Sequence, residues 1–78
     1  MIFQDKKKYR DFIIIPRTSH RLVIGINGTQ LRQIEQRQGV VVEFPRRKSG
    51  SEFVYILGDD RNQIEGAKTE LDVIIKIL

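Results

Sequence analysis

Two glycines spaced three residues apart, Gly25 and Gly28, most strongly constrain how this 78-residue chain can fold. They lie between two short amphipathic segments, and glycine supplies the backbone freedom that a tight turn between helices requires. Because glycine has no Cβ atom, another backbone can approach the turn closely. A helix that opens at Thr29 adds free N–H groups and the positive end of its dipole, so the turn is a candidate phosphate site. By itself, the motif is a weak signal that in most chains marks only a turn.

The residues before the turn predict a strand followed by a short helix. Aromatic and β-branched side chains run from Tyr9 to Ile15, and Pro16 ends the run because it has no amide hydrogen to donate. Thr18 or Ser19 is the expected N-cap of the helix that leads into the turn. Residues 1–8 are polar and rich in lysine, and we expect them to form a flexible lead-in to the domain.

The residues after the turn predict a second helix, a hairpin and a last helix. The second helix spans Thr29–Gln38, and strands over 40–44 and 53–57 can pair around a basic loop at 46–51. Asp59 or Asp60 is the expected cap of the last helix, whose apolar stripe comprises Ile64, Ala67, Leu71, Ile74, Ile75 and Leu78. The order of elements predicts an α+β domain with its helices on one face of a three-stranded sheet.

Length and charge limit the function of the chain. It can form one domain with a modest core. Residues 1–48 contain 11 basic and 4 acidic side chains, whereas residues 49–78 contain 3 and 6, so the first part favours a polyanionic partner. The absence of cysteine excludes a disulfide framework and a thiolate metal site, and it fits an intracellular protein. No apolar run approaches the roughly 18 residues of a membrane span, so we expect no membrane partner.

Taken together, residues 9–78 resemble a KH domain of the eukaryotic type I. The resemblance rests on linked motifs along the chain: Ile13-Ile14-Ile15-Pro16, Ser19-His20-Arg21-Leu22-Val23-Ile24-Gly25, the glycine loop, Gly39-Val40, and Val54-Tyr55-Ile56-Leu57-Gly58-Asp59. The His-Arg-x-Val-Ile-Gly form is similar to modules of vigilin-like multi-KH proteins. The resemblance implies an antiparallel sheet in the order first, third, second strand, with three helices on one face.

The resemblance also implies a function. KH domains bind single-stranded RNA or DNA in a groove, and the loop between their first two helices clamps the nucleotide backbone. We therefore expect a module for RNA or, failing that, DNA, within a larger cytoplasmic or nuclear protein. The residues expected at the nucleic acid are Arg21, Gly25, Ile26, Asn27, Gly28, Thr29, Arg32, Val42, Arg46, Arg47 and Lys48.

Each of these residues has a plainer interpretation. The arginines and the basic loop are also typical of solvated surface, and a residue such as Val42 is more often simply part of a core. Many nucleic-acid-binding KH domains carry lysine or arginine at the loop centre, where this chain has Ile26 and Asn27. The missing charge predicts weaker binding than a lysine-bearing loop would give.

Nothing in the sequence predicts an enzyme, a metal site or a cofactor. His20 is the only histidine, so no metal cluster or nucleophile–base pair can be built around it, and we interpret it as a helix-surface residue. Capping explains Asp59 and Asp60 as well as a pair of catalytic carboxylates does. The glycine loop also lacks the Gly-Lys-Ser/Thr ending of a nucleotide-binding P-loop.

The alternation in the third strand supports a second hypothesis, a protein-interaction module with weak or lost nucleic-acid binding. If Val54 and Ile56 face the helices, their neighbours point to the opposite face of the sheet. The side chains expected on that face are Phe53, Tyr55, Leu57, Ile13, Ile15 and Val41. Left uncovered, they form a large apolar patch for a small domain, and the expected partner is a second copy or a neighbouring KH domain.

Overall fold

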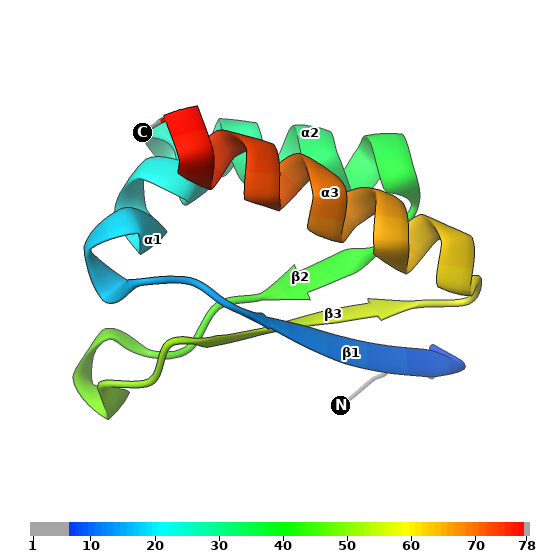
Figure 1. Cartoon of the computed structure of the whole chain (residues 1–78), viewed down its shortest axis with the longest axis horizontal. Coiled ribbons are helices and arrows are strands. Elements are labelled where there is room, and N and C mark those ends of the chain that lie inside the picture. The colour runs from blue at the N-terminus through cyan, green and yellow to red at the C-terminus, as the bar shows by residue number, and fades with distance from the viewer. Residues whose placement is uncertain (1–6, 78) are drawn as a thin grey trace.

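A computed structural model describes residues 7–77 as a three-stranded sheet covered on one side by three helices (Figure 1). The elements in chain order are β1 (Tyr9–Ile14), α1 (Arg17–Ile24), α2 (Thr29–Gln38), β2 (Val41–Glu43), β3 (Phe53–Gly58) and α3 (Arg61–Ile77). Single 3₁₀ turns occupy Ile26–Gly28 and Arg47–Ser49. The strands are antiparallel in the order β1-β3-β2. The predicted α+β fold and its β-α-α-β-β-α order are confirmed.

Helix α1 begins earlier than the predicted caps allow. Pro16 occupies the N-cap position with φ −52° and ψ 137°, and no side chain caps the helix, so the prediction of Thr18 or Ser19 as the cap is wrong. Proline takes this position because its fixed φ angle suits it and no N–H is needed there. The prediction of Asp60 as a cap of α3 is confirmed, since the Asp60 carboxylate accepts a hydrogen bond from the Asn62 backbone amide at 2.8 Å.

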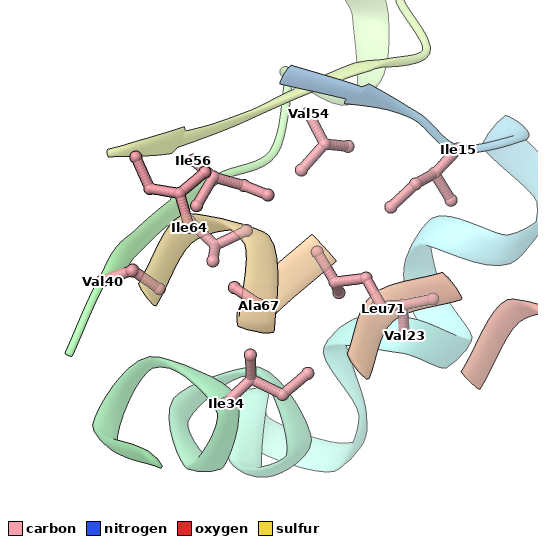
Figure 2. Close-up of a cluster of buried hydrophobic side chains, with 10 residues drawn as sticks. Ile15, Val23, Ile34, Val40, Val54, Ile56, Ile64, Ala67 and Leu71 are labelled. Carbon is pink, nitrogen blue, oxygen red and sulfur yellow. The ribbon is translucent and has the colours of Figure 1, made fainter. Parts of the chain in front are cut away.

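The core lies between the sheet and the helices (Figure 2). Its buried side chains come from all six helices and strands or from the residues next to them, and each large one stabilises the fold by about 1.5–3 kcal/mol. They are Ile15, Val23, Ile34, Val40, Val42, Val54, Ile56, Ile64, Ala67 and Leu71, at most 6% exposed. Every residue of the predicted α3 stripe that the structure describes is buried or packs on this core, and Leu78 lies outside the described residues.

The register of β1 reverses the predicted direction of its side chains. In the pairing of β1 with β3, Ile13 lies opposite Val54 and Phe12 lies opposite Tyr55. Directly paired residues share a face of the sheet, so Ile13 faces the helices and Phe12 faces away from them. The prediction that Ile13 lies on the outer face is therefore wrong.

Ile15 was expected on the same outer face, and that prediction is also wrong. The strand ends one residue earlier, and the Ile15 side chain is 0% exposed within the core. Ile14, which is 55% exposed, takes the outer position opposite Phe53. The prediction for Val41 is confirmed, because it pairs with Leu57 on the outer side.

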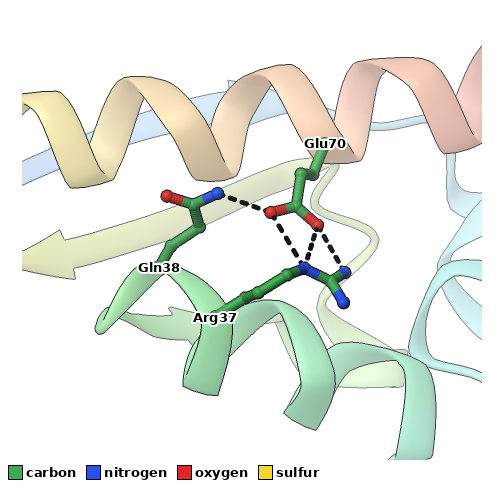
Figure 3. A network of polar contacts seen from close by, with 3 residues as sticks. All are labelled: Arg37, Gln38 and Glu70. Carbon is green, nitrogen blue, oxygen red and sulfur yellow. Dashed lines mark hydrogen bonds and ion pairs between the residues drawn. The ribbon is translucent and has the colours of Figure 1, made fainter.

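Polar contacts fix the helices to each other and to the sheet. The Arg37 guanidinium of α2 donates to the Glu70 carboxylate of α3 at 2.6 Å, and the Gln38 amide donates to the other carboxylate oxygen at 2.6 Å (Figure 3). The hydrogen bond from Arg37 lowers the pKa of Glu70. Between β1 and α3, the Lys68 ammonium lies 3.0 Å from the Asp11 carboxylate, and this hydrogen bond lowers the pKa of Asp11.

The start of the described chain is held by Asp59, in the turn between β3 and α3. The Lys8 amide donates to the Asp59 carboxylate at 3.3 Å, and the Lys7 ammonium lies 3.7 Å from it. The expected lead-in covers residues 1–8, of which residues 1–6 lie outside the described part of the chain.

Candidate nucleic-acid interface

The glycine loop between α1 and α2 has a backbone that requires glycine at its first position. Gly25 has φ 82° and ψ 178°, a combination that is essentially restricted to glycine. A Cβ atom at Gly25 would also lie 2.8 Å from the Cβ of Gln30. Gly28 is left-handed with φ 73°, but a Cβ atom there would meet only the Arg32 guanidinium, at 3.7 Å. Thus the turn needs Gly25 for space and conformation, and Gly28 for conformation alone.

The two middle residues of the loop point into solvent. Ile26 is 84% exposed, and Asn27 has a left-handed backbone with φ 56°, which asparagine tolerates better than most residues. The first turn of α2 braces the loop: the Thr29 hydroxyl donates to the Ile26 carbonyl at 2.7 Å, and the Arg32 guanidinium donates to the Asn27 carbonyl at 3.1 Å. The loop is therefore held in one shape while its tip remains accessible to a ligand.

A groove of about 560 Å³ lies between α1 and the segment that follows β2. It is lined by Arg17, Thr18, His20, Arg21, Ile24, Phe44, Pro45 and Arg47. Three of these residues are arginines and none is acidic. The apolar members offer a surface on which a base can lie, and the guanidinium groups can bind phosphate oxygens. The groove therefore has the chemistry that a single-stranded nucleic acid needs.

His20 is not the plain helix-surface residue that the sequence indicated. Its Nε2 atom lies 2.7 Å from the Ile15 carbonyl oxygen, and its half-buried ring packs edge-on against Phe44 at 5.2 Å between centroids. A carbonyl oxygen only accepts hydrogen bonds, so Nε2 carries the hydrogen. The histidine therefore ties the end of β1 to α1 and positions the Phe44 ring in the groove wall.

Arg17 joins the two sides of the groove at one end. Its backbone amide donates to the Glu52 carboxylate at 3.2 Å, and its Nη2 atom donates to the carbonyl of Arg47 in the basic loop. Its Nη1 atom is buried without a hydrogen-bond partner. Sequence analysis missed Arg17 and Phe44 because the contacts that bring them to the groove are made across the fold. The only local signal was a basic residue directly after Pro16.

The remaining predicted site residues divide into two groups. Arg21 is exposed and also lines a second hollow, of about 870 Å³, together with Leu22, Gly25, Ile26, Asn27, Thr29, Gln30 and Gln33. The structure thus brings Arg21 and most of the predicted loop residues together. Neither hollow is lined by Gly28, Arg32, Arg46 or Lys48. Val42 is 6% exposed and belongs to the core.

The described part of the chain lacks two further features. Residues 7–77 contain no cluster of histidine, cysteine, aspartate or glutamate side chains that could hold a metal ion. None of the helices described there has the length and apolar character needed to cross a membrane.

Comparison with known families identifies the domain. The family model described as KH domain matches residues 10–72. This chain belongs to the KH-domain family. The matched range includes residues 25–28 of the glycine loop. KH domains are generally modules that bind single-stranded nucleic acid, not enzymes.

Similar proteins place this KH domain near vigilin. It is 37% identical over 60 residues to vigilin of Gallus gallus and 38% identical over 60 residues to vigilin of Homo sapiens. Each match covers 74% of this chain and 5% of the relative, so the chain spans a small part of the vigilins that it matches.

Solved structures agree with that placement. The first KH type I domain of human vigilin superposes with a TM-score of 0.79 at 28% identity, covering 95% of this chain and 80% of that one. The eighth KH type I domain of human vigilin superposes with a TM-score of 0.80 at 32% identity, covering 86% of this chain and 70% of that one. The predicted resemblance to a type I, vigilin-like KH domain is confirmed.

Proposed function

We propose that this KH domain binds single-stranded RNA across the glycine loop and the groove beside it, as one of several modules in a larger intracellular protein of the cytoplasm or nucleus. The observation that carries the proposal is the groove itself, which joins an apolar wall to three arginines with no acidic side chain in its lining. The exposed, braced loop next to it provides backbone groups for a phosphate.

The position of the positive charge compensates in part for the uncharged loop centre. Ile26 and Asn27 give the loop no cation, but Arg21 lies beside both the groove and the loop hollow. Arg47 adds a second guanidinium group along the groove. Arg17 adds its positive charge, although its Nη2 atom already donates to the Arg47 carbonyl and its Nη1 atom is buried. Phosphate neutralisation therefore comes from the groove walls, and binding should weaken as the salt concentration rises.

Two aspartates at the loop tip test the proposal. In the Ile26→Asp, Asn27→Asp double variant, each carboxylate lies near a bound phosphate and costs about 1 kcal/mol or more even in water, so affinity should fall at least roughly tenfold. The fold should survive, because Ile26 is 84% exposed and aspartate, like asparagine, tolerates a left-handed backbone. Affinity for short single-stranded RNA of random sequence is measured by NMR titration, which also reports which residues respond.

A matched control separates a local effect from the general effect of charge. The double variant Asn62→Asp, Val73→Asp makes the same change of net charge at exposed positions on α3. We expect it to bind RNA nearly as well as the parent domain. If the loop variant binds as tightly as this control does, the glycine loop is not the RNA site. DNA of the same sequences, titrated in parallel, determines which nucleic acid is preferred.

A specific observation favours a second function, contact with another protein through the outer sheet face. Phe12, Ile14 and Phe53 are 44%, 55% and 43% exposed on that face, which no helix covers in the described part of the chain (Figure 1). We infer that a second copy or a neighbouring KH domain packs there. The two functions use opposite sides of the sheet and can coexist.

A further inference from the structure

The outer sheet face is defined by the residues that point away from the helices on all three strands. They are Arg10, Phe12 and Ile14 of β1, Phe53, Tyr55 and Leu57 of β3, and Val41 and Glu43 of β2. Its centre is apolar and aromatic, and its two charged side chains stand on opposite edge strands. This arrangement restricts what can bind there.

The rings of this face are already packed against one another. Phe12 stacks on Phe53, with 5.1 Å between the centroids and 2° between the planes, and the Tyr55 ring is tilted by 60° to the Phe12 ring at 6.3 Å. The Arg10 guanidinium covers Tyr55, 4.4 Å from the ring centroid. Stacking of a nucleobase requires an open ring face. One face of each phenylalanine ring and one face of the Tyr55 ring are therefore already covered. This leaves less ring surface for a base, and the face suits a protein surface better than a nucleic acid.

The two charged residues of the outer sheet face have opposite signs, so the face is complementary to a second copy of itself. Arg10 stands on β1 and Glu43 on β2, and neither forms an ion pair within residues 7–77. Glu43 pairs directly with Tyr55, and the Arg10 side chain leans over the same ring, so both charges lie near one row of the sheet. A two-fold axis parallel to the strands and above β3 places β1 of one copy over β2 of the other. Each Arg10 then faces Glu43 of the second copy.

We propose that two copies of this domain associate through their outer sheet faces about such an axis, with two reciprocal Arg10–Glu43 ion pairs flanking an aromatic centre. The inference rests on the proposed protein-contact function of this face and is independent of RNA binding. At about 200 Å² for a large side chain, the exposed part of the face offers on the order of 400 Å² per copy. Two copies thus bury less than the roughly 1,200 Å² of a stable interface, so the dimer is weak and forms readily only at high or tethered concentration.

Charge reversal on the full chain tests the proposed geometry. Sedimentation equilibrium is measured for Arg10→Glu and Glu43→Arg, each alone and in an equimolar mixture, with RNA absent. Each variant alone juxtaposes like charges across the two-fold axis, so its dimer dissociation constant should rise about tenfold or more. In the mixture, the two introduced side chains have opposite charges and would face each other, while the native pair would form on the opposite side. Association should therefore return to nearly the parent level.

Lys48→Glu provides a control with the same charge change as Arg10→Glu on the exposed basic loop, and it should leave self-association unchanged. Circular dichroism confirms that each variant is folded. The proposal is overturned if the parent domain stays monomeric at millimolar concentration, or if mixing the two variants restores nothing. If the domain is monomeric and its outer sheet face responds to added RNA, RNA occupies the face instead. If the face responds to deletion of residues 1–6, that segment occupies it instead. RNA affinity is measured separately, so failure of either proposal is visible without the other.

Discussion

The unequal demands of the two loop glycines lead to the sharpest prediction about stability. Alanine at Gly28 must adopt a left-handed backbone, which costs roughly 1–2 kcal/mol. Alanine at Gly25 must enter a region that is essentially restricted to glycine, at roughly 1–3 kcal/mol. Its Cβ atom would also lie 2.8 Å from the Gln30 Cβ and 3.2 Å from the Gln30 amide nitrogen, so the first turn of α2 must shift.

The size of the difference follows from these contacts. Crowding of a packed site adds about 1–3 kcal/mol, so we expect Gly25→Ala to destabilise the domain by roughly 2–6 kcal/mol, against roughly 1–2 kcal/mol for Gly28→Ala. The gain from restricting the unfolded chain is the same for both variants and cancels in the comparison. In a domain of this size, 1 kcal/mol corresponds to about 4–8 °C in Tm. The midpoints of the two ranges differ by about 2.5 kcal/mol, so the Tm of Gly25→Ala should fall about 10–20 °C below that of Gly28→Ala.

Urea unfolding followed by far-UV circular dichroism measures both free energies of unfolding. Gly50→Ala is the matched control: Gly50 has φ +75° and a Cβ atom there would meet nothing within 4 Å, so only the conformational penalty remains. We expect Gly50→Ala to resemble Gly28→Ala. If Gly25→Ala is as stable as those two variants, the crowding against Gln30 does not constrain the loop and the reasoning is wrong.

Two further predictions concern stability away from the loop. The pKa of Asp11 is lowered by its hydrogen bond from Lys68, so the stability from this pair is present above the unfolded pKa of 3.8 and is lost as the pH falls through the lower folded value. The Asp11 side chain is 42% exposed, so the pair contributes about 0.2–1 kcal/mol. In urea titrations between about pH 5 and pH 2, the Asp11→Asn variant should therefore lose less stability than the parent domain. Equal losses would contradict the assignment. Gly66 lies inside α3, where alanine is favoured by about 1 kcal/mol, but its Cβ would displace the Gln38 side chain that binds Glu70. Gly66→Ala should therefore change stability little alone and raise it in a Gln38→Ala background, and a decrease in that background, by the same measurement, would refute the packing argument.

Sequence reasoning identified the elements and the loop because their signals are local. Gly39 ends α2 in a left-handed conformation with φ 68°, and Asp60 caps α3. Gly25 and Gly28 mark the turn because few other residues adopt their backbone angles. The apolar residues of the α3 stripe repeat at a spacing that fits a helix and does not fit a strand. For these features, a few neighbouring residues contain the whole physical cause.

The direction of β1 could not be obtained in that way. Phe12, Ile13 and Ile14 are all apolar, so alternation along the strand does not tell which side faces the core. A shift of one residue in the pairing moves every side chain to the other face, and only the register with β3 determines which arrangement occurs. Because the outer sheet face depends on this register, the sequence predicts only part of its membership.

The walls of the candidate groove likewise depend on contacts between distant parts of the chain. The sequence by itself determined the KH family, the glycine loop and the basic character of the first half. Tertiary structure alone placed Arg17 against the carbonyl of Arg47 and His20 against Phe44, and it buried Val42 in the core. The physical reason is that local conformation depends on neighbours in the chain, whereas a groove is formed by side chains that only packing of the whole domain brings together.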